Sequence, residues 1–274
     1  MADRFAFGAN WRRFLRVLDD ERIEEASRSL QVMLDRDLTG RSFLDVGSGS
    51  GLFSLAAVRL GAARVHSLDY DPESVACTAE LKRRYFPDLE TWTVERGNAL
   101  DTAYLDTLGR WDVVYSWGVL HHTGRMWDAL ANVAPLVAPR GQLFISIYND
   151  QGRRSRLWSF VKRGYNAAPR AVRTPYVVAV MAPYEIGRTM LALATGHPRL
   201  YVESWTRYKS ARGMSRWRDH VDWVGGWPYE VARPDEIFDF FRQRGFTLQR
   251  LHTPLGWGTN EYVFERDGDG PPAG

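Results

Sequence analysis

Between residues 41 and 148, short apolar runs alternate with amphipathic stretches of roughly a dozen residues. Apolar runs of this length are typical of strands buried on both faces, and strands that alternate with helices form βαβ units. The predicted strands are residues 42–46, 64–68, 91–94, 111–116 and 142–148, and the predicted helices between them are residues 52–60, 72–86 and 126–137. The pattern therefore predicts an α/β fold with a doubly wound, mostly parallel sheet.

The alternation stops after Asn149 and returns with a predicted helix at 234–244 and predicted strands at 247–252 and 261–266. The intervening stretch is too long for an ordinary loop, so it must have structure of its own. Its predicted helices are residues 155–165 and 176–194, which Pro175, Pro183 and Pro198 interrupt. We predict four parts: a helical cap over residues 1–40, an α/β domain over 41–150 and 231–266, a helical insertion over 151–230 and a disordered tail over 267–274.

Charge and aromatic residues are unevenly distributed. Residues 151–230 hold 14 Lys and Arg against 5 Asp and Glu, whereas the rest of the chain holds 22 against 28. The same segment has 5 of the 11 Trp and 6 of the 12 Tyr. A basic, aromatic insertion is typical of a region close to a ligand or an anionic surface.

Cysteine content and the N-terminus bear on the compartment. The single cysteine, Cys77, excludes an internal disulfide framework and a zinc site built from cysteines. The first residues contain no apolar segment of the kind found in secretory signals. We therefore expect a cytoplasmic protein.

The turn after the first predicted strand reads Asp45-Val-Gly-Ser-Gly-Ser-Gly51. Alternate glycines in such a turn allow backbone N–H groups and a helix N-terminus to approach a ligand closely. Asp69 ends the second predicted strand, where an adenosine ribose would present its hydroxyls, and Gly97-Asn98-Ala99 follows the third. Three such elements at successive strand ends indicate a nucleoside-containing cofactor.

These residues resemble those of the class I S-adenosylmethionine-dependent methyltransferases, over residues 41–149 and 233–266. The resemblance implies a Rossmann-like, seven-stranded fold in which the glycine loop holds the methionine part, Asp69 the ribose and Asn98 the adenine. The family usually has Asp where Asn98 stands. The expected cofactor site comprises Asp45, Gly47, Ser48, Gly49, Gly51, Asp69, Tyr70, Asn98, Ala99 and Trp117.

A dinucleotide oxidoreductase is the alternative among enzymes. Its fingerprint requires glycine at the sixth position of G-x-G-x-x-G, and counting from Gly47 that position is Leu52. The sequence therefore favours the methyltransferase.

The fourth predicted strand is followed by Val119-Leu-His-His122, which resembles the small-molecule branch that includes the ubiquinone and menaquinone biosynthetic methyltransferases. An imidazole titrates near neutral pH and can accept a proton from the group being methylated. We expect His121 to be the proton acceptor and His122 to fix the loop; the alternative is a purely structural role for either. No carboxylates stand in ligand spacing to these histidines, so we expect no metal.

The acceptor site is expected at the carboxyl ends of the strands, beneath the insertion as a lid. Its expected residues are Tyr148, Asn149, Trp223, Trp227 and Tyr229. The arginines at the start of the insertion suit either an anionic group or a solvated face, and the apolar stretch 176–194 suits contact with a membrane surface. The N-terminal aromatic cluster of Phe5, Phe7, Trp11 and Phe14, with Asn10, would cap the cofactor or pack in the core.

The function expected from these features is methyl transfer to an oxygen or nitrogen of a small molecule, for which anionic, glycosidic and quinone- or lipid-like acceptors are the candidates. A nucleic-acid methyltransferase is an alternative because the insertion is basic and aromatic, but the strand-four motif of base-methylating enzymes is absent. A non-catalytic S-adenosylmethionine-binding protein is a third possibility. The sequence leaves the oligomeric state open.

Overall fold

The computed structural model describes residues 8–206, 216–254 and 258–268. Phe5, Phe7 and residues 269–274 of the predicted tail lie outside this range, as does Tyr208 of the insertion. The described residues divide into two compact units: residues 8–151 with 230–268, here called the α/β unit, and 152–206 with 216–229, here called the insertion unit.

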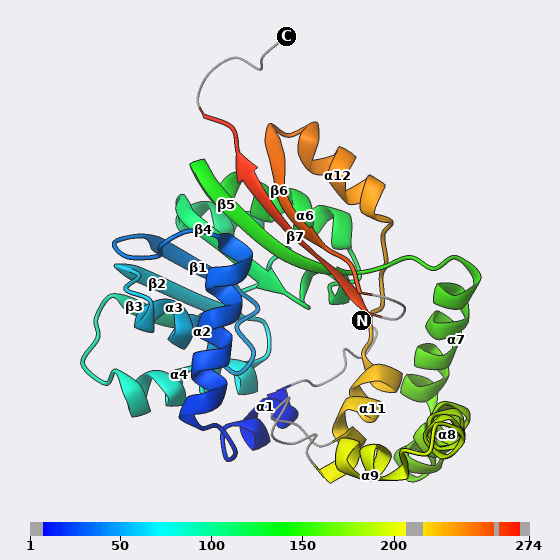
Figure 1. Ribbon diagram of the computed structural model, residues 1–274. Coiled ribbons are helices and arrows are strands. Elements are labelled where there is room, and N and C mark those ends of the chain that lie inside the picture. Colours follow the sequence, from blue (N-terminus) through cyan, green and yellow to red (C-terminus); the bar gives the residue numbers. More distant parts are fainter. Residues whose placement is uncertain (1–7, 207–215, 255–257, 269–274) are drawn as a thin grey trace. The chain divides into compact units, whose positions relative to one another are not determined.

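The α/β unit contains a seven-stranded sheet with the order β3-β2-β1-β4-β5-β7-β6 (Figure 1). Its strands are β1 (Ser42–Val46), β2 (Arg64–Asp69), β3 (Trp92–Arg96), β4 (Trp111–Trp117), β5 (Val137–Tyr148), β6 (Phe246–His252) and β7 (Thr259–Arg266). The first five strands are parallel, and β7 runs antiparallel to both β5 and β6. The predicted fold class is confirmed.

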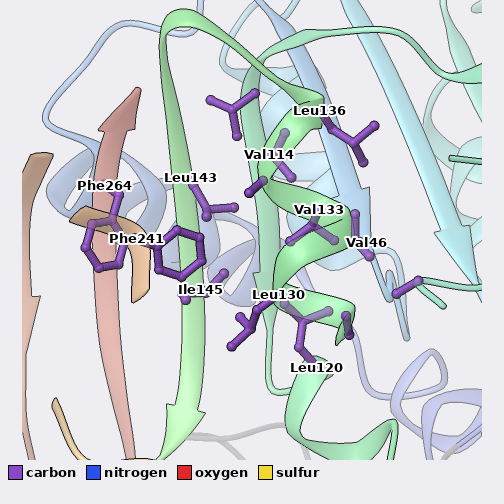
Figure 2. Close-up of a cluster of buried hydrophobic side chains, with 14 of the residues drawn as sticks. Val46, Val114, Leu120, Leu130, Val133, Leu136, Leu143, Ile145, Phe241 and Phe264 are labelled. Atoms are coloured by element: carbon purple, nitrogen blue, oxygen red, sulfur yellow. The ribbon is translucent and has the colours of Figure 1, made fainter. Parts of the chain in front are cut away.

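Helices cover both faces of this sheet, as the apolar runs require. One buried cluster joins α2 (Asp20–Leu34), α3 (Leu52–Arg59) and α4 (Pro72–Tyr85) to side chains such as Phe43 and Phe144. The other joins α5 (Thr102–Thr107), α6 (Met126–Val133) and α12 (Pro234–Arg242) to the opposite face. Figure 2 shows Leu130 and Val133 of α6 pointing toward Val46, Val114 and Leu143 of the sheet.

Aspartates fix the starts of three helices. The side chains of Asp19, Asp71 and Asp101 accept backbone N–H groups of the first turns of α2, α4 and α5. An N-cap of this kind satisfies a donor that the helix itself leaves unpaired, and contributes about 1 kcal/mol. Pro72, directly after Asp71, has a backbone angle that suits the first helical position.

Some details of the α/β unit differ from the predicted elements. Within the predicted helical cap of residues 1–40, the described residues form two helices, α1 (Gly8–Phe14) and α2, because Asp19 starts a new helix. The strand predicted over 142–148 begins earlier, because β5 starts at Val137 and runs through Pro139–Gly141. The pairing of β4 with β5 shifts register between Trp111 and Val113, and Arg140 has a φ of 59°, so an irregular segment accommodates the Pro-Arg-Gly sequence within the strand.

The insertion unit is helical and has a small core. Its helices are α7 (Arg153–Ala167), α8 (Arg170–Ala194), α9 (Pro198–Thr206) and α11 (Arg216–Gly225). The core comprises Tyr165, Val177, Met181 and Val224, with partly buried side chains around them. The predicted interruption at Pro175 and Pro183 is wrong, because α8 passes through both. Each proline removes one intrahelical hydrogen bond, and packing against α7 and α11 stabilises the helix instead.

The chain leaves and re-enters the α/β unit at one place. The backbone N–H of Asp150 donates to the carbonyl of Ala232 at 3.0 Å, and that of Ala232 donates to the carbonyl of Tyr148 at 3.0 Å. Both ends of the insertion therefore lie at the carboxyl end of β5.

Candidate active site

The glycine loop between β1 and α3 requires glycine for two reasons. Gly47, Gly49 and Gly51 have φ values of 88°, 56° and 80°, which other residues rarely adopt. A Cβ atom on Gly47 would lie 2.3 Å from the side chain of Val119, and one on Gly51 would lie 2.8 Å from the Cα atom of Thr78. The loop is thus packed against the segment after β4 and against α4. The N–H groups of Gly47, Ser48, Gly49 and Gly51 donate to acceptors within the protein, which fixes the loop's conformation.

Asp69 links the end of β2 to this loop. Its carboxylate accepts the backbone N–H of Gly49 at 2.9 Å and that of Asp71 at 2.8 Å. The carbonyl of Leu68 also accepts the N–H groups of Gly47 and Ser48. Burial raises the pKa of Asp69 to about 6, against the lowering effect of these N–H donors. The predicted ribose-binding acid therefore adjoins the glycine loop.

Asp45 lies beneath the loop and is buried. The hydroxyl of Ser54 in α3 donates to its carboxylate at 2.5 Å, Ser67 donates to Ser54 at 2.7 Å, and the indole N–H of Trp92 donates to Ser67 at 2.8 Å. Burial raises the pKa of Asp45 to about 7, and the neighbouring charge of Asp69 adds to this rise. In this geometry Asp45 holds the start of α3 in place, and Ser48, also buried, contacts Thr78 at 3.0 Å.

Asn98 and Ala99 follow β3 at the same edge of the sheet. The side chain of Asn98 accepts the N–H of Leu100 at 3.0 Å, which leaves its amide NH₂ group as a donor. The backbone N–H of Gly97 donates to the carbonyl of Asp69 at 3.0 Å, so the ends of β2 and β3 are joined. The carbonyl of Ala99 accepts the side chain of Asn132 at 3.0 Å. The structure thus brings the predicted loop, ribose acid and third-strand residues to one edge.

Two large aromatic side chains stand exposed at this edge. Tyr70, which directly follows the buried strand β2, is 43% exposed, and Trp117, the last residue of β4, is 44% exposed. The Arg96 guanidinium lies 5.4 Å from the ring centre of Tyr70. The indole N–H of Trp117 donates to Glu261 at 2.7 Å. Exposed aromatic surface at the carboxyl ends of parallel strands is suited to stacking on a planar ligand.

The two histidines after β4 differ in burial. His121 is 1% exposed, and its Nδ1 lies 3.1 Å from the carbonyl oxygen of Ser146 in β5. Since a carbonyl only accepts, Nδ1 is the donor. His122 is half-buried, and its ring centre lies 4.5 Å from that of His121. The ring of Tyr148 contacts both histidines: its centre lies 4.2 Å from the ring centre of His121 and 5.5 Å from that of His122.

The expected division of roles between the histidines stays a prediction. The structure shows that His121 is buried and ties the segment after β4 to β5. His122 is the more accessible of the two. The sequence could not distinguish them because the two are adjacent and chemically identical.

Two functional candidates were missed by sequence reasoning. The Glu230 carboxylate accepts the backbone N–H of Met126 at the start of α6. The backbone N–H of Glu230 donates to the carbonyl of His121 at 3.0 Å. Burial raises the pKa of the Glu230 carboxyl group. Glu261 lies at the start of β7 and binds both Trp117 and His252. Only the antiparallel direction of β7 brings the beginning of that strand to the carboxyl edge, and no local sequence signal shows this.

The N-terminal helix α1 adjoins the loop. The N–H of Gly8 donates to Asp71 at 2.9 Å, and the indole of Trp11 lies 3.1 Å from the position that a Cβ atom on Gly49 would take. Phe14 is instead buried in the core beneath α2. Among the described members of the expected aromatic cluster, Trp11 and Phe14 contact each other edge-on, with ring centres 6.2 Å apart, and Trp11 also adjoins the glycine loop.

The expected acceptor residues belong to both units. Tyr148 and Asn149 end β5 in the α/β unit, whereas Trp223, Trp227 and Tyr229 belong to the insertion unit. Within that unit, Lys162 donates to the carbonyl of Trp223 at 2.5 Å and lies 4.9 Å from the ring centre of Tyr229. Burial lowers the pKa of Lys162 to about 7. In the part of the chain that the structure describes, no three His, Cys, Asp or Glu side chains gather as metal ligands.

Comparison with known families shows which protein family the chain belongs to. A sequence model described as "Methyltransferase domain" matches residues 18–249, most of the chain. The chain belongs to this methyltransferase family. The resemblance seen in the sequence is thereby confirmed.

The similar curated proteins match over short segments. Ribosomal protein L11 methyltransferase from Methylococcus capsulatus is 52% identical over 48 residues, covering 18% of this chain and 16% of that protein. The enzyme of the same name from Anoxybacillus flavithermus is 32% identical over 115 residues, covering 37% and 36%. The chain thus spans from about a sixth to about a third of the length of these relatives.

Similar solved structures cover more of the chain at lower identity. Magnesium protoporphyrin IX methyltransferase from Synechocystis, with bound SAH, has a TM-score of 0.54 at 14% identity, over 89% of this chain and 82% of that one. An O-methyltransferase family protein from Burkholderia thailandensis also has a TM-score of 0.54 at 14% identity, over 92% and 59%. These similarities establish a shared fold.

Proposed function

We propose that the protein transfers a methyl group from S-adenosylmethionine to an oxygen or nitrogen of a small molecule. The observation that carries this proposal is the meeting of the glycine loop, Asp69 and Asn98 at one edge of the sheet, joined by the hydrogen bonds of Gly49 and Gly97 to Asp69. Each of these groups is suited to one part of a nucleoside with a charged tail.

The residues at this edge fit the cofactor in shape and charge. The glycine loop turns tightly at the end of β1, because Gly47 packs against Val119 where any side chain would clash. Asp69 offers a carboxylate to the ribose hydroxyls, Asn98 offers its NH₂ group to the adenine, and the exposed ring of Tyr70 offers a stacking surface. When bound, S-adenosylmethionine supplies a methyl group on a positively charged sulfur, and the carboxylates at this edge favour that charge.

In this proposal His122 is the base that removes a proton from the acceptor. It stands after β4 and is more accessible than His121, and the ring of Tyr148 holds it edge-on. A positioned base of this kind contributes roughly two to four orders of magnitude to turnover. The remaining acceleration comes from alignment of donor and acceptor.

A protein acceptor is the second candidate, favoured by one observation. The sequence similarity to the ribosomal protein L11 methyltransferase from Anoxybacillus flavithermus extends over 115 residues at 32% identity. The shared segment is about a third of those enzymes, so it supports a common cofactor-binding core more strongly than a common acceptor.

The two candidates are separated by the fate of a radioactive methyl group. Purified protein is incubated with methyl-labelled S-adenosylmethionine and either the low-molecular-mass fraction of a bacterial extract or purified ribosomal protein L11. The proposal predicts label in a small molecule, and markedly less label with the Asp69→Ala variant. Label in ribosomal protein L11, or in no acceptor at all, would contradict it.

A further inference from the structure

Helix α8 is the most apolar element of the insertion unit. An 18-residue window within it has a mean hydropathy of 1.3, so that by length and composition it could cross a membrane. One side of the helix packs inside the insertion unit, where Val177 and Met181 are buried beside Tyr165 and Val224. The helix is therefore held by its neighbours along one side.

The opposite side of α8 is exposed and uncharged. Its members recur at helical spacing, with relative exposures from 47% to 65% for the four large side chains. They are Val172, Ala179, Ile186, Met190 and Leu193, here called the apolar stripe. The helical spacing directs the charged residues of α8 away from the stripe. Exposed apolar surface of this extent is typical of a docking site.

Polar contacts fix the orientation of α8 in the insertion unit. The Glu185 carboxylate lies 3.1 Å from His220 Nε2 of α11 and accepts the hydroxyl of Tyr201 of α9 at 2.9 Å. The Arg173 guanidinium donates to the carbonyls of Asn166 and Ala168, at the end of α7. Rotating α8 to bury the stripe within the unit, or inserting the helix through a bilayer, would break these contacts.

Helix α7 of the same unit combines exposed apolar side chains with positive charge. Leu157 and Phe160 of α7 are 65% and 69% exposed, and Arg153, Arg154 and Arg156 stand beside them in the sequence. Among the described residues these three arginines form no ion pair. The insertion as a whole has 14 Lys and Arg against 5 Asp and Glu.

Apolar side chains combined with unpaired arginines match an anionic lipid surface. A second copy of the chain would bring two basic insertions together, and a nucleic acid offers nothing to the apolar stripe. We propose that the insertion unit docks on anionic phospholipid membranes, with the apolar stripe of α8 entering the interface and the arginines of α7 contacting headgroups. This inference does not rest on methyl transfer.

Vesicle flotation of the full chain tests the proposal. The probes are vesicles of phosphatidylcholine alone and of phosphatidylcholine with phosphatidylglycerol. We expect the protein to float with the second kind, less so as salt increases, because salt screens headgroup attraction. The Ile186→Glu/Met190→Glu variant is expected to lose at least about tenfold in vesicle affinity, and neutralising Arg153, Arg154 and Arg156 to glutamine is expected to cost roughly fivefold per arginine.

The matched control for one added charge is Val32→Glu at an exposed apolar position of α2 in the α/β unit, and it is compared with Ile186→Glu alone in the apolar stripe. The Val32→Glu variant is expected to float like the wild type. Far-UV circular dichroism of each variant checks that the helices remain folded. The proposal is overturned if the wild type does not float, or if the Ile186→Glu/Met190→Glu variant floats equally well. It is also overturned if the bound protein resists an alkaline carbonate wash, because that would indicate a helix that spans the membrane. Dissociation of an oligomer by the stripe variant without any vesicle binding would also overturn it, in favour of contact between copies.

Discussion

The α/β unit and the insertion unit use their side chains in opposite ways. In the α/β unit, two large apolar clusters are buried, and acidic and amide side chains gather at the strand ends. In the insertion unit the buried core is small, and large apolar side chains face outward on α7 and α8. The first arrangement suits a cofactor site whose geometry is set by a rigid sheet, and the second suits a region that recognises a partner.

Glycine substitutions give the largest expected contrast between the units. Gly47→Val forces a branched side chain into a φ of 88° and against Val119, so we expect a loss of about 4 kcal/mol or more in the free energy of unfolding. Gly187→Ala is the counterpart, because Gly187 lies inside α8 with no atom near its added Cβ. That change is expected to stabilise the protein by about 0.5–1 kcal/mol. Urea denaturation measures the free energy of unfolding of both variants. Equal changes in the two variants would contradict the contrast between the units.

The histidine pair gives the next largest effect, and it bears on the α/β unit alone. His121→Ala removes a buried ring and its hydrogen bond to Ser146, so we expect a loss of about 2–3 kcal/mol in unfolding free energy. His122→Ala is expected to cost less stability and to lower turnover by roughly two to four orders of magnitude, with cofactor affinity unchanged. Denaturation and steady-state kinetics measure the two effects. Full turnover in the His122 variant would remove its assignment as the base.

Buried titratable groups predict opposite pH dependence in the two units. Burial raises the pKa of Asp45 to about 7, so the folded state holds this proton more tightly than the unfolded state, and stability falls as pH rises from about 4 to 7. Burial lowers the pKa of Lys162 to about 7, so the unfolded state binds that proton more tightly, and stability rises with pH above about 7. We expect each contribution to be a few kcal/mol, because one pKa unit corresponds to about 1.4 kcal/mol.

Denaturation across pH checks both contributions. Asp45→Asn should flatten the fall at acid and neutral pH, and Lys162→Met should flatten the rise at alkaline pH. An unchanged profile in either variant would show that the group does not titrate as its burial indicates.

The predictable part of the site was local in sequence. Asp45 and Asp69 lie at the ends of buried strands and the glycines follow directly, so strand position alone places them at one edge. Glu230 and Glu261 reach the site only through the return of the chain after the insertion and the antiparallel direction of β7. Likewise the continuity of α8 through Pro183 depends on packing against α7 and α11, which a local proline rule omits.

The central claim is that the α/β unit binds S-adenosylmethionine through its strand ends, and titration calorimetry tests it most directly. We predict one S-adenosylmethionine per chain and no binding of NAD. Asp69→Ala should weaken the affinity roughly tenfold to hundredfold, because the ribose hydroxyls lose a charged acceptor. The Ile186→Glu/Met190→Glu variant, altered only in the insertion unit, should bind like the wild type. Binding of NAD, absence of S-adenosylmethionine binding, or an unchanged dissociation constant in the Asp69 variant would contradict the account.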